Sequence, residues 1–265
     1  MSERTVLITG ASSGIGDAFA DVFAAEGYQI VAVARREDRL HALAARLHAR
    51  HGTTVHVMPA DLGVPDSRER LCADLAARGL VIDALVNNAG YGVPGTFGSV
   101  TWERHQAALQ VMTVGLCELT YRLLPGMIER RWGRIINVAS LAGLVPAPAG
   151  HTLYAATKAF AIKFSEALAG ESRPHGVHVT ALCPGFTLSE FHDVTGTRAQ
   201  VSALPRWLWT DAPTVARSGY DAVMRGDAVH VVGRVNQTIA ALVRIVPMSV
   251  VNAVGRRVGT RYRKL

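Results

Sequence analysis

Short apolar runs alternate with longer stretches of helical period, and this alternation constrains the fold more than any other feature of the chain. Strands are expected at residues 6–9, 29–34, 55–58, 84–86, 135–139, 177–182 and 228–232. The runs are continuously apolar, which is typical of strands covered on both faces of a sheet. The pattern therefore predicts an α/β fold: a Rossmann-type, doubly wound parallel sheet of about seven strands with helices on both faces.

The length of the chain limits its domain organisation. A chain of 265 residues fits one large α/β domain better than two, and no repeat or low-complexity linker divides it. We therefore expect residues 1–265 to form a single domain. Residues 187–211 lack a clean period and are interpreted as a helical lid over a site. Residues 235–265 form a basic, apolar C-terminal tail.

The formal net charge of +7 is concentrated at the C-terminal end. Residues 228–265 carry seven basic side chains and no acid, so residues 1–227 are formally neutral. This distribution does not support a general nucleic-acid-binding surface. Three interpretations of the tail stay open: contact with an anionic membrane surface, packing as a subunit contact or as a cover for the site, and docking of an acidic carrier protein. We favour packing slightly and expect a homodimer or homotetramer.

Cysteine usage and hydropathy bear on the compartment. Cys72, Cys117 and Cys183 are widely spaced without a metal-ligand pattern, so we expect reduced thiols and no metal site. No secretory signal opens the chain, and no apolar stretch is long enough for a membrane span. We expect a cytoplasmic protein, with membrane association through the tail as the alternative.

A glycine-rich turn joins the first predicted strand to the first helix. Its sequence is TGASSGIG over residues 9–16. Glycine allows a sharp turn and a close approach of the backbone to a phosphate, and the helix N-terminus offers free N–H groups to an anion. The turn predicts a dinucleotide site that uses Gly10, Ser12, Ser13, Gly14, Ile15 and Gly16.

The end of the second predicted strand indicates which dinucleotide binds. Folds that bind NAD place an acid there to hold the ribose 2′-hydroxyl, but this chain has Arg35 and Arg36. A guanidinium grips a phosphate with paired hydrogen bonds. We therefore predict NADP(H) in preference to NAD(H), with Arg35 as the main contact and Arg36 as the second. The alternative is that Arg36 and Arg39 only solvate the next helix.

Polar and small residues follow two further strands. Asp61 and Leu62 come after the third strand, where the carboxylate of Asp61 could accept a hydrogen bond from the adenine amino group. The NNAG sequence that ends the fourth strand contributes Asn88, Ala89 and Gly90. Ligands of open α/β sheets bind at the carboxyl ends of the strands, so both segments are predicted to contact the cofactor.

A serine, a tyrosine and a lysine form the candidate catalytic group. Ser140 ends the fifth predicted strand, and Tyr154 and Lys158 follow with a spacing that puts both on one helix face. The pKa of a tyrosine is about 10, and lowering it by ~3 units needs roughly 4 kcal/mol. An ammonium about 4 Å away supplies that amount at an effective dielectric near 20. Lys158 is thus expected to lower the pKa of Tyr154.

The motifs TGxxxGIG, NNAG, Ser140, YxxxK and Pro184-Gly185 stand in one order along the chain. In that order the chain closely resembles the short-chain dehydrogenase/reductase family over residues 4–190. The resemblance implies an oxidoreductase that interconverts a ketone and a secondary alcohol, with Tyr154 as acid and base. It also implies that Ser140 binds the substrate carbonyl oxygen and that Tyr154 and Lys158 contact the cofactor, Lys158 at the nicotinamide ribose. Pro184, Gly185 and Thr187 would border the nicotinamide.

One position departs from the family pattern. The family usually has an asparagine in the long fourth helix, which holds a water that relays protons to the lysine, and Met112 stands there. A thioether is a poor hydrogen-bond partner. Either Thr113 or another water path replaces the relay, or turnover is slowed. A non-catalytic cofactor-binding sensor or interaction protein of the same fold is the alternative.

Apolar side chains gather in three loops that should meet near the nicotinamide. They are Tyr91, Val93, Pro94, Phe97, Leu144, Val145, Pro146, Phe186, Phe191, Leu204, Trp207, Leu208 and Trp209. Their density predicts an apolar pocket for a bulky ketone or a 3-oxoacyl-type substrate, although ordinary lid packing would explain it equally well. An epimerase or dehydratase on the same scaffold is less favoured, because this lid is apolar.

Overall fold

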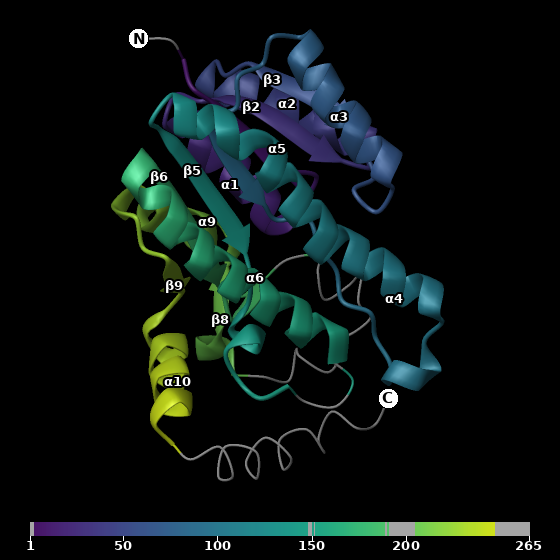
Figure 1. The fold of residues 1–265 in the computed structure, drawn as a ribbon, viewed down its shortest axis with the longest axis vertical. Coiled ribbons are helices and arrows are strands. Elements are labelled where there is room, and N and C mark those ends of the chain that lie inside the picture. Colours follow the sequence, from purple (N-terminus) through teal and green to yellow (C-terminus); the bar gives the residue numbers. More distant parts are fainter. Residues whose placement is uncertain (1–2, 148–149, 151, 189, 191–204, 247–265) are drawn as a thin grey trace.

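The computed structural model describes residues 3–147, 150, 152–188, 190 and 205–246, and its centre is one parallel sheet (Figure 1). The strands lie in the order β3-β2-β1-β4-β5-β6-β9. Their bounds are β1 (Thr5–Thr9), β2 (Gln29–Ala34), β3 (Val55–Pro59), β4 (Ala84–Asn87), β5 (Gly133–Val138), β6 (Val177–Cys183) and β9 (Val229–Val231). Each pairs in parallel with its neighbours. The predicted strands are confirmed, with ends that differ by one or two residues.

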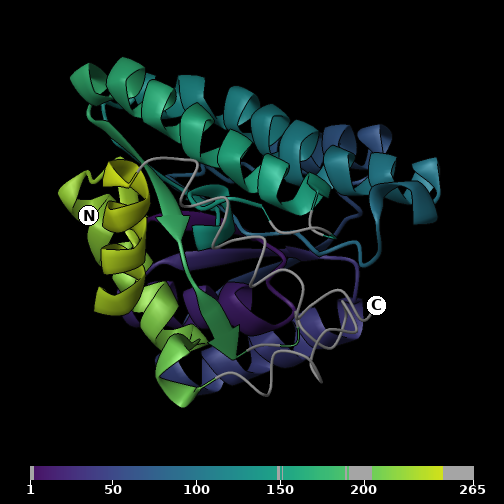
Figure 2. The ribbon, with the colours of Figure 1, turned by 90° about the horizontal axis from the view of Figure 1, so that it is seen from below.

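Helices cover both faces of the sheet (Figure 2). One layer contains α1 (Gly14–Ala25), α2 (Glu37–His51) and α9 (Ala212–Arg225). The other contains α3 (Pro65–Ala77), α4 (Trp102–Leu109), α5 (Leu116–Glu129) and α6 (Thr152–Ser172), with a π-helical turn at Gln110–Gly115 between α4 and α5. The final described helix is α10 (Arg234–Ile245). This arrangement confirms the predicted fold class.

The alternation of side chains along the strands creates two cores. Val6 and Ile8 of β1 pack with Phe19 of α1 on one face of the sheet. Leu7 points to the other face and packs with Leu119 of α5. Because both faces are buried, every residue of β1 is apolar or hydrogen-bonded, which explains the continuous apolar runs.

The strand order reverses at the boundary between β1 and β4. From β1 the chain moves outward to β2 and β3, and then returns to the other side of β1 at β4. The connections on the two sides of this boundary run in opposite directions, which opens a crevice at the carboxyl ends of the strands. The glycine-rich turn, the two arginines after β2 and the NNAG sequence all lie at this edge.

The predicted helical lid is wrong in its described part. Strand β7 (Phe186–Leu188) pairs in parallel with β8 (Trp209–Asp211), and a short 3₁₀ turn precedes β8. The rings of Phe186 and Trp209 pack 5.6 Å apart, and aromatic residues favour strands over helices. Residues 191–204, which include Phe191 and Leu204 of the predicted pocket, lie outside the described residues.

The described part of the predicted tail consists of α10 and Val246, and residues 247–265 lie outside the described residues. One face of α10 buries Asn236 and Ala240, while Leu242 and Ile245 are exposed. Of the described helices, none is long and apolar enough to cross a membrane. Among the described residues, no group of His, Cys, Asp or Glu side chains could hold a metal ion.

A chain of buried amides joins the two central strands to the helices above them. Asn87 donates to Thr120 Oγ1 at 3.1 Å and to Asn137 Oδ1 at 2.9 Å, and Asn137 donates to Ser165 Oγ at 2.9 Å. Asn137 is 0% exposed. This network fixes β4 and β5 against α5 and α6, the helix that carries Tyr154 and Lys158.

We expect Asn137→Leu to lower the free energy of unfolding by about 1–3 kcal/mol, because it removes the partner of a buried amide. Urea denaturation followed by circular dichroism measures the change. Gln237→Leu, at an exposed amide of α10, is the control and should change stability little. Equal stability of the Asn137 variant and the wild type would contradict a structural role for the network.

Candidate active site

The turn after β1 is tied to the turn after β4 by hydrogen bonds. Thr9 Oγ1 donates to the carbonyl of Val86 and accepts from the backbone N–H groups of Asn88 and Ala89, at 2.9 and 3.0 Å. In return, Asn88 Nδ2 donates to the carbonyls of Thr9 and Gly10, at 2.9 and 3.3 Å. Thr9 had not been singled out as a site residue, although its place at a strand end was an available signal.

The glycine-rich turn has the geometry of a phosphate cradle. Gly10 and Gly14 have positive φ angles, +67° and +60°, which favour glycine. A Cβ atom on Gly16 would lie 2.3 Å from the carbonyl oxygen of Gly10, so no larger residue fits. Helix α1 begins at Gly14, and the side chain of its cap residue Ser13 makes no capping hydrogen bond. The turn therefore fits the pyrophosphate of a dinucleotide, with helix N–H groups available to it.

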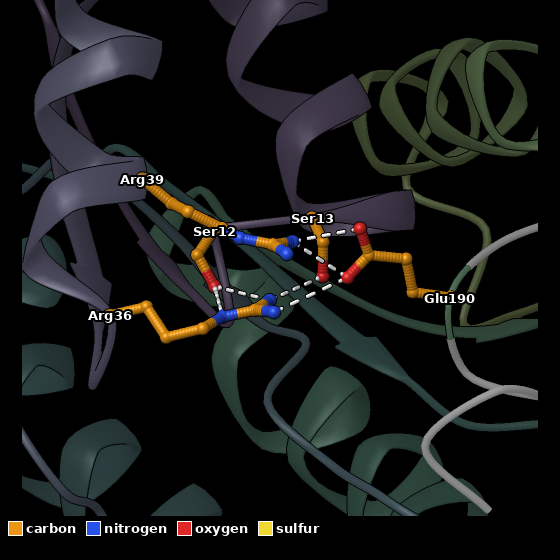
Figure 3. A network of polar contacts seen from close by, with 5 residues as sticks. All are labelled: Ser12, Ser13, Arg36, Arg39 and Glu190. Atoms are coloured by element: carbon orange, nitrogen blue, oxygen red, sulfur yellow. Dashed lines mark hydrogen bonds and ion pairs between the residues drawn. The ribbon is translucent and has the colours of Figure 1, made fainter.

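An arginine cluster formed by Ser12, Ser13, Arg36, Arg39 and Glu190 lies beside this turn (Figure 3). Arg36 Nη2 donates to Ser12 Oγ at 3.0 Å and to Ser13 Oγ at 2.9 Å. Arg36 Nη1 and Arg39 Nη1 donate to the Glu190 carboxylate, at 3.3 and 2.7 Å. Both guanidinium groups hold the pKa of Glu190 below its ordinary value, Arg39 more strongly. The cluster is thus an anion site that a carboxylate of the same chain occupies.

Arg35 does not join the arginine cluster. Its side chain is 70% exposed, and Nη1 lies 3.9 Å from the carboxylate of Asp61. Successive residues of an extended segment point to opposite sides, and the backbone at Arg36 is extended. Of the two arginines, Arg36 is the one that reaches the glycine-rich turn.

Asp61 and Leu62 both have partners within the chain. Asp61 Oδ1 accepts from the N–H of Gly63 at 2.9 Å. The Leu62 side chain is 7% exposed, and its carbonyl accepts from Arg68 at 2.6 Å. They stand at the end of β3, on the same edge of the sheet as the arginine cluster.

The three predicted catalytic residues lie together. Ser140 follows β5, and its side chain lies near enough to Tyr154 of α6 to lower the pKa of that tyrosine. Lys158 Nζ lies 5.7 Å from the centre of the Tyr154 ring and donates to the carbonyl of Val138 at 2.7 Å. The side chains thus converge at the carboxyl end of β5.

Burial dominates the electrostatics of this group. It raises the pKa of Tyr154, and the nearby Ser140 side chain offsets the rise only in part. Burial also lowers the pKa of Lys158 to about 8. In the protein alone the pKa of Tyr154 is raised, and its lowering by Lys158 in the complex with cofactor stays a prediction. The ammonium of Lys158 lies beside the Tyr154 ring and donates to the carbonyl of Val138. Removal from water disfavours both the Tyr154 phenolate and the Lys158 ammonium.

Met112 fills the space beside the catalytic lysine. It is 4% exposed and lies in the π-helical turn, a feature frequent at functional sites. A Cβ atom on Gly90 would meet Met112 Sδ at 3.3 Å and Lys158 Nζ at 3.7 Å. The hydroxyl of Thr113 donates to the carbonyl of Leu109 in its own helix. The ammonium of Lys158 donates to the carbonyl of Val138.

The segment after β6 borders the site from the other side. The carbonyl of Pro184 accepts from the N–H of Leu141 at 2.9 Å. Thr187 is 5% exposed, and its hydroxyl donates to the carbonyl of Gly185 at 3.3 Å. A Cβ atom on Gly185 would lie 2.5 Å from Asn236 Nδ2 of α10. The first part of the predicted tail therefore packs against this segment.

A cavity next to Tyr154 is the candidate substrate pocket. Its lining residues are Val93, Gly95, Phe97, His105, Ala108, Met112, Gly150, Thr152, Leu153 and Tyr154. Val93 and Phe97 were predicted there, whereas Trp207 is 66% exposed and is not a lining residue. His105 had not been predicted as a lining residue. The available signal was its position three residues before Ala108, which is four residues before Met112. Residues with these spacings lie on the same face of a helix.

Comparisons with known proteins agree with this geometry. The sequence profile of the short chain dehydrogenase family matches residues 4–199. A serine 3-dehydrogenase from Rhizobium radiobacter is 38% identical over 189 residues, which cover 71% of this chain and 73% of that protein. A very-long-chain 3-oxoacyl-CoA reductase from Mycosarcoma maydis is 30% identical, over 80% of this chain and 61% of that protein.

A solved structure extends the comparison to three dimensions. It is a short-chain dehydrogenase from Sphingobium yanoikuyae in complex with NADPH, 34% identical with a TM-score of 0.79, and the match covers 86% of this chain and 87% of that chain. The alternative of a non-catalytic binding protein is therefore not retained. The chain belongs to the short chain dehydrogenase family and is an NAD(P)-dependent oxidoreductase that acts on CH–OH and C=O groups.

Proposed function

We propose that this enzyme uses NADP(H) to interconvert a ketone and a secondary alcohol on an apolar or 3-oxoacyl-type substrate, with Tyr154 as acid and base. The carrying observation is the convergence of Ser140, Tyr154 and Lys158 at the edge of the sheet that holds the glycine-rich turn. The nicotinamide would supply or accept the hydride. The protein would supply the proton, the orientation and the exclusion of water.

Each catalytic side chain has a separate task in this proposal. Tyr154 gives its hydroxyl proton to the substrate oxygen during reduction and takes it back during oxidation. Ser140, which follows β5 near Tyr154, donates to the same substrate oxygen and orients it. A buried phenolate needs a nearby positive charge, because burial alone raises the pKa of Tyr154. Lys158 provides it below its pKa of about 8.

The cofactor residues divide by the part of the dinucleotide that they would contact. Gly10, Gly14, Ile15 and Gly16 would hold the pyrophosphate. Arg36, with Arg39, Ser12 and Ser13, would bind the 2′-phosphate in place of the Glu190 carboxylate, and Arg35 becomes a secondary contact. Asp61 and Leu62 would border the adenine, and Asn88, Ala89 and Gly90 the middle of the cofactor. Pro184, Gly185 and Thr187 would border the nicotinamide, and Lys158 its ribose.

The lining of the cavity supports an apolar substrate. Side chains of Val93, Phe97, Ala108, Met112 and Leu153 surround it, and ligand pockets combine apolar walls with a few placed polar groups. The similarity to a 3-oxoacyl-CoA reductase is in keeping with a 3-oxoacyl-type substrate.

For the tail we propose the packing role. The contact of Asn236 with Gly185 supports α10 as a cover at the edge of the site. The exposed side chains of Val235, Leu242 and Ile245 would face a second subunit of a homodimer or homotetramer.

We expect Tyr154→Phe to lower kcat/KM about 10²–10⁴-fold, because it removes the proton donor and keeps the ring. Steady-state assays with NADPH and a panel of ketones measure the loss, and fluorescence titration should show unchanged NADPH binding. Tyr121→Phe, at a tyrosine that is 79% exposed on α5, is the matched control. Undiminished turnover in the Tyr154 variant would overturn the mechanism.

We expect Arg36→Ala to weaken binding of 2′,5′-ADP about tenfold or more, since a charge-assisted hydrogen bond contributes about 1.5–3 kcal/mol. Arg35→Ala should have a smaller effect, and Glu190→Gln should strengthen binding because it removes a competing carboxylate. Calorimetry with 2′,5′-ADP, and with 5′-ADP as the ligand that lacks the 2′-phosphate, tests all three. A larger loss in Arg35→Ala than in Arg36→Ala would restore Arg35 as the main contact.

The buried lysine predicts a pH-dependent stability. Because the pKa of Lys158 falls from its ordinary 10.5 to about 8 on folding, the unfolded chain binds the proton more tightly between these values. The free energy of unfolding should therefore rise with pH across this interval. We expect the stability of the wild type relative to Lys158→Met to be lowest below pH 8 and to increase towards pH 10.5. Urea denaturation at several pH values measures it, and a flat difference would show that burial leaves this pKa unshifted.

A further inference from the structure

His105 lines the cavity next to Tyr154 and carries a buried polar atom that has no partner. The residue is 5% exposed, and Nδ1 makes no hydrogen bond with any described atom. Three other side-chain atoms share this state in the described structure, on Tyr28, Arg134 and Ser172, and none of these residues lines the cavity. An unpaired buried polar atom costs about 1–3 kcal/mol, so its place in a substrate pocket calls for an explanation.

The surroundings of His105 determine which nitrogen carries the proton. Nε2 lies 2.9 Å from the carbonyl oxygen of Phe97. A carbonyl oxygen only accepts hydrogen bonds, so Nε2 must be the donor. In the neutral ring Nδ1 then has a free lone pair and is an acceptor.

The ring is held in a fixed orientation. Phe97 stacks on it with ring centres 4.8 Å apart and an angle of 19° between the planes. His105 shares a helix face with Ala108, and both line the cavity with Met112. Because stacking and the Phe97 carbonyl fix the ring, Nδ1 stays in one place.

We propose that His105 is a substrate-binding residue whose Nδ1 accepts a hydrogen bond from a hydroxyl or N–H group of the substrate. The inference rests on the proposed function and makes its substrate class narrower. The preferred ketone carries a hydrogen-bond donor close to its carbonyl, in addition to the apolar part that fills the cavity. A ketone without such a donor leaves Nδ1 unpaired, and a site built to bind a hydroxyl discriminates against analogues that lack it.

Pairs of ketones test this proposal. Each pair consists of a phenyl ketone with a hydroxyl on the first, second or third carbon from the carbonyl, and its methyl ether. The ether keeps the oxygen and its electronic effect on the carbonyl but cannot donate. For at least one pair we expect wild-type kcat/KM to favour the hydroxyl compound by about tenfold or more.

Variants at position 105 separate substrate binding from a structural role. His105→Phe keeps the stacking on Phe97. In this variant the ratio of kcat/KM for the hydroxyl compound to kcat/KM for its ether should be close to one, with turnover of the ether retained. His105→Asn places an acceptor near the position of Nδ1 and should restore part of the preference, whereas His105→Gln keeps a donor towards the Phe97 carbonyl and should not. His178→Phe, at another histidine bonded to a backbone carbonyl, is the control. A preference that survives in His105→Phe, or that only Gln restores, would overturn the proposal.

A measurement without turnover keeps this inference distinct from the proposed function. In nitrogen NMR spectra of histidine-labelled protein with bound NADPH, we expect the His105 ring to be protonated at Nε2. The chemical shift of Nδ1 should change on addition of the hydroxyl compound and should not change on addition of the ether. Protonation at Nδ1 alone, or equal shifts with both compounds, would overturn the inference. Loss of all ketone reduction in the wild type would instead overturn the proposed function.

Discussion

The hydrogen bonds between Thr9 and the turn after β4 are the interaction on which the rest of the site depends. They close the boundary between β1 and β4, where the strand order reverses. Asn88 Nδ2 holds the carbonyl of Gly10, and this carbonyl leaves no space for a Cβ atom on Gly16. Residues 79 positions apart therefore set the conformation of the phosphate cradle together.

Burial is the second constraint, and it shifts the pKa values of both Tyr154 and Lys158. It keeps Tyr154 protonated. It also lowers the pKa of Lys158 to about 8, so the ammonium of Lys158 loses its proton more easily. In water neither shift would occur. The site therefore stores its proton on the phenol, and the ammonium of Lys158 is held by the Val138 carbonyl. Met112 fills the space beside Gly90 and Lys158 with an apolar side chain that is 4% exposed.

Local patterns were sufficient to predict the strands, the fold class and the three side chains that converge after β5. Strand β1 follows from a continuous apolar run, and the spacing of four residues places Tyr154 and Lys158 on one face of α6. The same patterns could not rank Arg35 against Arg36, because a shift of one residue turns a side chain to the opposite side of an extended segment. Nor could they show that Phe186 and Trp209 pair as strands, since their pairing partners lie far apart in the sequence.

The sequence by itself determined which elements form, their order, and the residue types at the carboxyl edge of the sheet, because these depend on short-range spacing and on burial. Only the tertiary structure decided which side chains meet there. Arg36 contacts Glu190 across 154 positions, and Asn88 donates to the carbonyl of Gly10 across 78 positions. Such contacts depend on the packing of whole helices and loops, which no local spacing encodes.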